Sequence, residues 1–302
     1  MSTTEYFVLM DVGGTSLKSV VLSREGKILK NSFSLMPIDS RGSSEEIIGT
    51  ITSVLKEQSN KAKEIGEFKG IGLSIPGPFD YGKGISRMKH KFQSLYGIDL
   101  RNEIIKMLGL PKGLPVIFEE DSTAFLRGEA WMGNAKCFNR IIGLTLGEGL
   151  GAAFMVNGKI TRDTSQGVPL NGELWHLPCE EGILEDKLSR RGIIRIYREI
   201  TGSSEEVDVK DIALRAESGD IDSIRTFEEF GLITGQLLRP HVQRFNAECI
   251  VIGGQISKSF ELFATPLNEV LSEIPSLKKV TRARSIELSP LYGLLRCFSE
   301  NS

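Results

Sequence analysis

A glycine-containing loop between two apolar segments near the start of the chain constrains the fold most strongly. The segment 8–10 is apolar enough to form a buried strand, and a second apolar run at 20–22 resumes a strand after the loop. Gly13 and Gly14 lack a Cβ, so their backbone can approach a ligand closely. A P-loop would need a following helix and a Gly-Lys-Ser/Thr ending, and neither is present. The sequence therefore predicts a strand, a loop and a second strand.

The groups around this loop suit a phosphate and its Mg²⁺. Asp11 ends the first expected strand, and Thr15 follows the two glycines. One carboxylate, one hydroxyl and several backbone N–H groups would then line a small concavity, which is a suitable environment for an anion and a hard cation.

A second glycine loop repeats this pattern further along the chain. The segment 140–151 is expected to form a strand that ends in Gly147-x-Gly149-x-Gly151, and a second strand follows at 152–156. Both hairpins close alike, with Gly-Lys-Ile at 26–28 and again at 158–160. The spacing is not GxGxxG and no helix follows, which disfavours a dinucleotide-binding fold. A single loop of this kind can be a plain hairpin turn, but the matched pair indicates duplicated lobes that face each other across a cleft.

Helices and strands alternate over the rest of the chain, which is typical of an α/β layer. We expect helices at 44–59, 100–108, 121–131, 183–200, 208–218, 223–245, 258–273 and 292–298, strands at 70–75, 115–118, 248–252 and 285–288, and irregular structure over 161–184. The expected domains are an N-terminal lobe of residues 1–118, to which a C-terminal helix at 290–302 returns, and a larger lobe of residues 119–289.

The composition excludes several functional classes. The 302 residues are 40% apolar and 25% charged, and the net charge of −2 comes without a basic stripe, so no nucleic-acid partner is expected. No apolar run approaches the roughly 18 residues of a membrane helix, and the first residues lack signal-peptide character. Four widely spaced cysteines are expected to be reduced and mostly buried. These features predict a cytoplasmic protein with no membrane partner.

Three consecutive acidic residues follow the strand expected at 115–118 and open a helix. These residues are Glu119, Glu120 and Asp121. A helix N-terminus favours a charged carboxylate beside it, and the buried strand before the acids argues against a simple solvated face. The simpler interpretation of Asp121 is a helix N-cap, because Asp is common there. We expect this junction to open into a cleft.

Together these segments resemble the ROK family of sugar kinases, within the sugar kinase/Hsp70/actin superfamily. The resemblance covers nearly the whole chain and rests on motifs in the family's order. They are Asp11-Val-Gly-Gly-Thr15, Ser74-Ile-Pro-Gly-Pro78, Glu119-Glu-Asp121, Thr145-Leu-Gly-Glu-Gly-Leu-Gly151, Gly172-Glu173-x-x-His176, Leu184-Glu185 and Ile252-Gly-Gly254. It implies an α/β, two-lobed, actin-like ATPase (ribonuclease H-like) fold with a central interdomain cleft.

The resemblance also implies an activity and its residues. The implied reaction transfers the γ-phosphoryl group of ATP to a hexose or hexose derivative, at the 6-hydroxyl, with Asp121 as the catalytic base and Mg²⁺ held through water by Asp11. The implied nucleotide-binding residues are Asp11, Gly13, Gly14, Thr15, Lys18, Thr145, Gly147, Gly149, Gly253 and Gly254. The implied sugar-binding residues are Gly77, Pro78, Glu120, Glu173, His176 and Glu185. His176 alone would suggest a structural histidine, but Glu173 nearby favours a ligand role. A homodimer is a family expectation only.

The chain departs from the family's pattern at several positions. The zinc segment Cys-x-Cys-Gly-x-x-Gly-Cys is absent, so no structural zinc is expected. Glu120 replaces the Asn that contacts the sugar, and Glu148 replaces a threonine of the second phosphate motif. Like charges about 4 Å apart repel by about 4 kcal/mol at an effective dielectric constant of 20. Mg²⁺ or Lys18 must therefore offset Glu148, or Glu148 must point away. The unusual segment 89–96 is a candidate for substrate specificity.

Two other classes share this fold. Glu120 and Glu148 also suit a catalytically weakened sugar-binding or regulatory protein. A DNA-binding repressor would carry a helix-turn-helix before the first phosphate motif, and we expect none because that motif starts at Asp11. The sequence leaves the sugar open among glucose, mannose, an N-acetylated hexosamine and a glycoside.

Overall fold

The computed structural model describes residues 3–300, which form two compact units. Unit 1 joins the chain up to Gly128 with the segment from Glu287 onward, and unit 2 is Glu129–Ile286. The division falls within helix α3 (Asp121–Met132), beyond the boundary at residue 118 that we expected from the sequence. Each unit is described by itself below.

Unit 1 is built on a five-stranded sheet in the order β3-β2-β1-β4-β7. The strands are β1 (Glu5–Val12), β2 (Ser16–Ser23), β3 (Ser34–Pro37), β4 (Glu67–Ile75) and β7 (Val116–Glu120). β1 pairs antiparallel with β2 and parallel with β4, and β4 pairs parallel with β7. The carboxyl ends of β1, β4 and β7 therefore meet at one edge. The register places Asp11 beside Ser74, and Ser74 beside Glu119.

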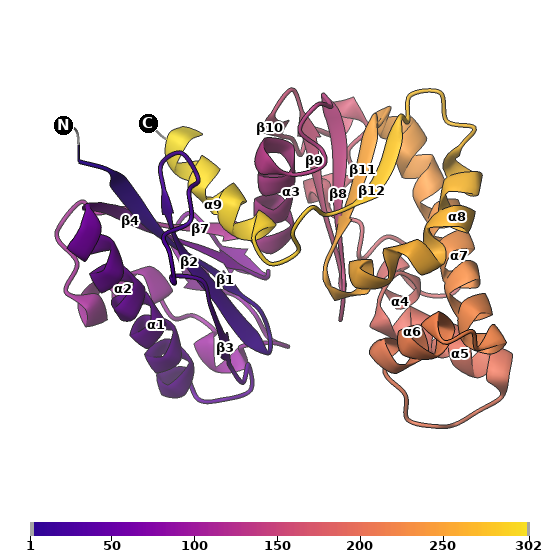
Figure 1. Cartoon of the computed structure of the whole chain (residues 1–302), viewed down its shortest axis with the longest axis horizontal. Coiled ribbons are helices and arrows are strands. Elements are labelled where there is room, and N and C mark those ends of the chain that lie inside the picture. The colour runs from indigo at the N-terminus through magenta and orange to yellow at the C-terminus, as the bar shows by residue number, and fades with distance from the viewer. Residues whose placement is uncertain (1–2, 301–302) are drawn as a thin grey trace. The chain divides into compact units, whose positions relative to one another are not determined.

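Helices cover both faces of this sheet because side chains alternate along each strand. Even-numbered residues of β1 join a buried cluster with α1 (Ser44–Ile65) and α2 (Leu100–Leu108), whereas Phe7 packs on Phe298 of α9 (Ser289–Glu300), with ring centroids 4.7 Å apart. Figure 1 shows α9, in yellow, beside β1 and β4 although these elements lie at opposite ends of the chain. The expected helix at 44–59 extends to Ile65 because its apolar stripe continues through the buried Ala62.

Three short elements complete unit 1. The small sheet of β5 (Phe79–Asp80) and β6 (Ile85–Ser86) and the 3₁₀ turn η1 (Gln93–Leu95) lie between β4 and α2 in the chain. The sequence pattern did not predict β3, β5 or β6, because such short strands carry too few residues for a periodicity to be visible.

Glycines allow α9 to lie close to α3. A Cβ on Gly293 would lie 1.7 Å from the carbonyl oxygen of Ala124, so the two backbones touch where a side chain would stand. We expect Gly293→Ala to lower the free energy of unfolding by about 2–3 kcal/mol, the upper range for overpacking, as measured by urea denaturation. Gly49→Ala is the matched control, because this helical glycine has open space around it and Ala stabilises a helix relative to Gly. Equal effects of the two substitutions would contradict the close packing.

Unit 2 repeats the topology of unit 1. Its sheet has the order β10-β9-β8-β11-β12. The strands are β8 (Arg140–Leu146), β9 (Leu150–Val156), β10 (Lys159–Ile160), β11 (Cys249–Gly253) and β12 (Lys279–Arg282). β8 pairs antiparallel with β9 and parallel with β11, which pairs parallel with β12. This order matches unit 1 strand by strand, which confirms the predicted duplication of a glycine hairpin followed by parallel strands.

Helices pack around the second sheet through one apolar cluster. They are α4 (Leu184–Lys187), α5 (Arg190–Thr201), α6 (Val209–Glu217), α7 (Ile221–Phe245) and α8 (Phe260–Leu271), with the 3₁₀ turns η2 (Thr164–Gln166), η3 (Leu170–Gly172) and η4 (Gln255–Ser259). The expected helix at 183–200 is divided, because Ser189 has the extended backbone (φ −146°) of a helix N-cap and α5 begins after it.

One expected strand is wrong. Residues 285–288 form a turn before α9, and the edge strand of the second sheet is β12 instead. The place beside β11 is already occupied by β12, so the alternating residues at 285–288 have no strand to pair with.

The four cysteines are free thiols, as predicted, but only two are buried. Burial raises the pKa of Cys249 and of Cys297 to about 12, so these thiols stay protonated at neutral pH. Cys137 is exposed and Cys179 is half-buried, which corrects the expectation of mostly buried thiols. Separately, no helix within residues 3–300 has both the length and the apolar character needed to cross a membrane.

Candidate functional site

The carboxylate of Asp11 is fixed at the end of β1 by two neighbours. Ser74 Oγ donates to Asp11 Oδ1 at 2.7 Å, and Lys18 Nζ lies 3.3 Å from Asp11 Oδ2. Lys18 reaches this position because β2 pairs it directly with Asp11 across the hairpin. The sequence motif included Ser74 but assigned it no role; its buried hydroxyl is the group that orients Asp11.

The first glycine loop presents unpaired backbone donors. The Gly13 N–H is used within the turn, because it donates to Ser16 O at 3.0 Å. Among residues 3–300, no hydrogen bond engages the N–H groups of Gly14 and Thr15. Two adjacent free amides on a tight turn form the kind of concavity that binds anions. The Gly13 N–H, which we expected to be available to a phosphate, is therefore already engaged, whereas those of Gly14 and Thr15 are free.

The three acidic residues at the junction of β7 and α3 have different surroundings. Glu119 is paired with Arg127, whose Nε lies 3.4 Å from Glu119 Oε2. Glu120 accepts a hydrogen bond from the Thr123 hydroxyl at 3.1 Å. Asp121 is the first residue of α3, and its carboxylate accepts the N–H of the next residue at 2.7 Å. The first two acids end β7 and are engaged by side chains of α3, whereas Asp121 accepts from the backbone.

Asp121 has the electrostatics of a general base. Burial raises the pKa of its carboxyl group, and the negative charge of Asp11 raises it further. The Ser122 N–H and the positive charge of Lys91 oppose the rise without cancelling it. A carboxylate whose proton affinity is increased by its surroundings is suited to accept a proton from a hydroxyl.

The segment that carries Lys91 is anchored beside the first loop. Phe92 is fully buried with φ +49°, a conformation that is rare for a bulky residue, and its N–H donates to Ser40 O at 3.0 Å. Ser40 N–H in turn donates to Gly14 O at 3.3 Å. Hydrogen bonds through Ser40 thus connect this segment to the first glycine loop. The sequence pattern had singled out the segment but not Lys91.

The Pro-Gly-Pro turn follows β4 at the same edge of the sheet. Gly77 and Pro78 are joined by a cis peptide bond, and the carbonyl of Pro78 accepts the N–H of Arg87 at 3.0 Å. The Tyr81 hydroxyl donates to the carbonyl of Ile75 at 3.1 Å, which holds the turn against the end of the strand. Unit 1 therefore brings together Asp11, Lys18, the first loop, this turn and Asp121.

The second glycine loop has the same construction as the first. The Gly147 N–H is used internally, donating to Gly149 O at 3.0 Å, and Gly147 O accepts the N–H of Arg190 at 2.8 Å. Within the described part of the chain, the N–H groups of Glu148 and Gly149 are unbonded. Gly147 therefore shapes the loop, and the free donors are the two residues that follow it.

The Gly253-Gly254 segment lies against this loop. Thr145 of β8 is in register with Gly253 of β11, so both strands end at the same level. Gly254 has φ +79° and ψ 174°, a region open essentially to glycine only. A Cβ there would lie 2.2 Å from the carbonyl oxygen of Leu146, the residue before Gly147. The two motifs expected to bind the nucleotide are thus adjacent in unit 2.

The expected sugar-binding residues of unit 2 lie on two paired segments. Glu185 N–H donates to Trp175 O at 3.1 Å, which sets α4 beside the segment carrying His176. His176 Nδ1 lies 3.6 Å from Glu173 Oε2 and has no hydrogen-bond partner among residues 3–300. Glu185 itself is engaged, because its Oε2 accepts the N–H of Leu150 at 3.0 Å. Glu185 therefore supports the second glycine loop in addition to lying beside His176.

Glu148 is offset by a residue that sequence reasoning missed. Its side chain is 67% exposed, and Arg190 Nε lies 3.5 Å from its Oε1. Lys18, one of the cations suggested for this task, is bonded to Asp11. The available signal was the arginine pair directly after Ser189, a residue type that often begins a helix.

Oxygen ligands for Mg²⁺ are present at the first loop. Asp11 and Ser74 offer a carboxylate and a hydroxyl, and Mg²⁺ keeps much of its water shell and takes few protein ligands. Within residues 3–300, no cluster of three or more His, Cys, Asp or Glu side chains forms a metal cage. The donors therefore fit a Mg²⁺ ion held mainly by water and phosphate oxygens.

Comparison with known proteins identifies relatives along almost the whole chain. Residues 7–289 match the model of the ROK family. The chain is 27% identical over 282 residues to a glucokinase of Thermotoga maritima, covering 86% of this chain and 85% of the glucokinase.

Solved structures give the same fold. A ROK family glucokinase from Streptomyces griseus, solved in complex with glucose and AMPPNP, superposes with a TM-score of 0.76 at 21% identity, covering 97% of this chain and 98% of that one. A ROK family transcriptional regulator, a homologue of the E. coli MLC protein, superposes with a TM-score of 0.77 at 20% identity, covering 99% of this chain and 81% of that one. The fold is therefore that of actin-like ATPases, as predicted.

Proposed function

The chain belongs to the ROK family, and we propose that it is an ATP-dependent sugar kinase that phosphorylates the 6-hydroxyl group of a hexose or hexose derivative. The chemistry of such a transfer is mostly positioning and charge stabilisation, with one carboxylate that accepts the hydroxyl proton. The kinase relative supports this reaction class.

The observation that carries the proposal is the position of Asp121. It lies at the edge where β1, β4 and β7 end, and its charge is disfavoured by burial and by Asp11. Glu119 pairs with Arg127 and Glu120 accepts from the Thr123 hydroxyl, so neither carboxylate is as free as Asp121 to act as a base. We assign Asp121 the role of the base that takes the proton from the sugar hydroxyl as the phosphoryl group arrives.

The free amides of the two loops are proposed to bind phosphate oxygens. Gly14 and Thr15 would contribute from unit 1, and Glu148 and Gly149 from unit 2. Asp11 would hold Mg²⁺ through water, and the ion would neutralise phosphate charge. Lys18 would hold the Asp11 carboxylate in position. The adenosine would lie along Gly253-Gly254, where the absence of side chains leaves the backbone open.

The sugar is proposed to contact residues of both units. Glu120 and the turn at 77–78 would contribute from unit 1, and Glu173, His176 and Glu185 from unit 2. His176 Nδ1 lies 3.6 Å from Glu173 Oε2, and an imidazole can donate to or accept from a sugar hydroxyl. Homodimer formation and a cytoplasmic location remain predictions.

A regulatory sugar-binding protein is the second candidate, because a transcriptional regulator shares the fold. Glu148 was one reason to expect weakened catalysis, but its side chain is 67% exposed and lies beside Arg190, which weakens that objection. Glu120 remains the departure that favours this alternative. The two functions differ in one property, since only a kinase releases ADP in proportion to sugar.

We expect ADP release with at least one sugar from a panel of glucose, mannose, N-acetylglucosamine, N-acetylmannosamine and a β-glucoside. A coupled assay for ADP measures turnover, and calorimetry with the same sugars measures binding. Sugar-dependent release at 1 s⁻¹ or faster, on the order of ordinary enzymes, would support the kinase. Sugar binding without ADP release from any member of the panel would favour the regulatory protein and overturn the kinase.

A further inference from the structure

Arg190, the first residue of α5, contacts the second glycine loop through both its backbone and its side chain. Its N–H donates to Gly147 O at 2.8 Å, and its guanidinium Nε lies 3.5 Å from Glu148 Oε1. Gly147 shapes the loop whose free amides we assign to the phosphates. Arg190 is therefore fixed at the point where a negatively charged ligand of this loop would lie.

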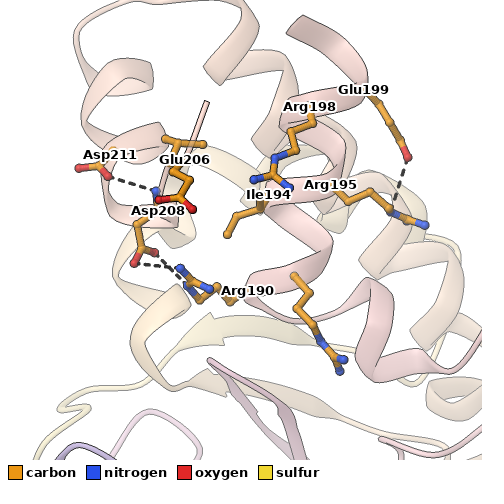
Figure 2. Close-up of a pocket in the computed structure, with 10 residues that line it drawn as sticks. Arg190, Ile194, Arg195, Arg198, Glu199, Glu206, Asp208 and Asp211 are labelled. Carbon is orange, nitrogen blue, oxygen red and sulfur yellow. Dashed lines mark hydrogen bonds and ion pairs between the residues drawn. The ribbon is translucent and has the colours of Figure 1, made fainter. Parts of the chain in front are cut away.

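The guanidinium of Arg190 also pairs with a second acidic residue, Asp208, and this contact can be broken when a ligand binds. Its Nε and Nη2 donate to the two carboxylate oxygens of Asp208, at 3.2 and 3.3 Å (Figure 2). Asp208 also caps α6, where its Oδ1 accepts the N–H of Val209 at 2.6 Å. This cap would satisfy Asp208 without Arg190. Because the pair is exposed, breaking it should cost little.

Arg190 has donors left for a ligand. Of its five N–H groups, those on Nη1 have no hydrogen-bond partner within the described residues. The side chain is 36% exposed and lines a cavity of about 820 Å³ along α5. Figure 2 shows it at one end of this cavity, with Ile194 and Arg198 further along the helix. An anion at the loop could therefore reach the guanidinium from solvent.

A positive charge at this position is needed to balance the negative charge at the second glycine loop. Glu148 brings a negative charge to a loop whose ligand would carry several more, and Arg190 is the cation in contact with that loop residue. The neighbouring Arg191 is engaged elsewhere, because its Nη2 donates to Glu185 Oε1 at 3.1 Å. A planar guanidinium matches phosphate oxygens in geometry as well as charge.

We propose that Arg190 is a phosphate ligand of the nucleotide, which turns from Asp208 and Glu148 to the polyphosphate when MgATP or MgADP binds. The proposal rests on the proposed kinase function. It adds Arg190, from α5, to the phosphate-binding groups that we propose for the two glycine loops. Glu148 then serves to hold Arg190 beside the loop while no nucleotide is present.

Isothermal titration calorimetry with MgADP and with adenosine tests this role. For Arg190→Gln we expect the Kd for MgADP to rise by about 10- to 100-fold, the range for a hydrogen bond to a charged group, and the Kd for adenosine to change by less than about twofold. Arg190→Lys should recover part of the loss because the charge remains. Arg198→Gln is the matched control, since it lies on the same helix and cavity, and should bind both ligands like the wild type.

A second pair of variants separates direct binding from neutralisation of Glu148. We expect Arg190→Gln to weaken MgADP binding in the Glu148→Gln background as well. Full recovery in that background would mean that Arg190 acts only on Glu148 and would overturn the proposal. An equal loss for MgADP and adenosine would also overturn it, because the effect would then be structural. If wild type binds MgADP but Arg190→Gln binds it equally well, only this inference fails; if wild type does not bind it, the kinase fails too.

Discussion

Asp121→Asn is expected to lower the turnover of sugar phosphorylation by about 10²- to 10⁴-fold, the usual contribution of a general base. The amide cannot accept the hydroxyl proton, but its oxygen keeps the shape and the backbone hydrogen bond of the carboxylate. Binding of MgADP should stay near the wild-type value. Turnover is measured by ADP release at saturating sugar, and binding by calorimetry.

The same substitution is expected to stabilise the protein. The pKa of Asp121 is raised in the folded state, so between the ordinary value of about 4 and the raised value the native state binds more protons than the unfolded state. The free energy of unfolding of the wild type therefore decreases as the pH rises through this window. In Asp121→Asn this contribution to the pH dependence is absent. Urea denaturation across this pH window should show that the free energy of unfolding of the variant rises relative to that of the wild type as the pH increases.

Asp99→Asn is the control for both measurements. Asp99 also begins a helix in unit 1 and accepts an N–H, from Asn102 at 3.0 Å. Asn caps a helix as well as Asp does, so activity and stability should both stay within error of the wild type. Near-normal turnover of Asp121→Asn would contradict the assignment of Asp121 as the base. A variant that lost activity together with stability would instead indicate a structural role.

Gly254→Ala is expected to lower the affinity for MgADP by about 10²-fold, the effect of displacing a binding group by roughly 1 Å. The new Cβ would stand 2.2 Å from Leu146 O, so β8 and the glycine loop after it must move. The backbone angles of Gly254 are also nearly closed to alanine, which adds a cost of about 1–3 kcal/mol to folding. Calorimetry and urea denaturation measure the two effects.

Gly202→Ala separates backbone strain from displacement of the loop. Gly202 also has a positive φ, +65°, but nothing lies within 4 Å of its missing Cβ. It follows α5 in unit 2, so it should lose about 1 kcal/mol of stability and keep its nucleotide affinity. If Gly202→Ala and Gly254→Ala reduced MgADP binding equally, the close approach of Gly254 to the loop would not explain the effect.

Much of the fold could be predicted because its signals are local. The glycine hairpins, the capping box before α1 and the acids after β7 each show within a few residues, and the order of motifs identified the family. Short edge strands such as β3 gave no periodic signal. The strand expected at 285–288 failed for a different reason. Its pattern was suitable, but the sheet edge was occupied by β12, which only the tertiary structure reveals.

The motifs of the candidate site are visible in the sequence, but its hydrogen bonds are not. The glycines of both loops were recognised, but sequence cannot tell which amide of a turn is used internally, and here those are Gly13 and Gly147. Arg190 was missed because its contact with Glu148 joins two elements well separated in the chain. Glu185 was expected to face the sugar, and its bond to the Leu150 N–H follows from the position of α4 beside β9.

A crystal structure of the protein with a non-hydrolysable ATP analogue, Mg²⁺ and the sugar that gives the highest turnover tests the central claim most directly. If Asp121 is the base, one sugar hydroxyl is expected to lie within about 2.6–3.2 Å of its carboxylate, on the side facing the terminal phosphate. A bound sugar with every hydroxyl beyond reach of Asp121, directly or through one water, would contradict it.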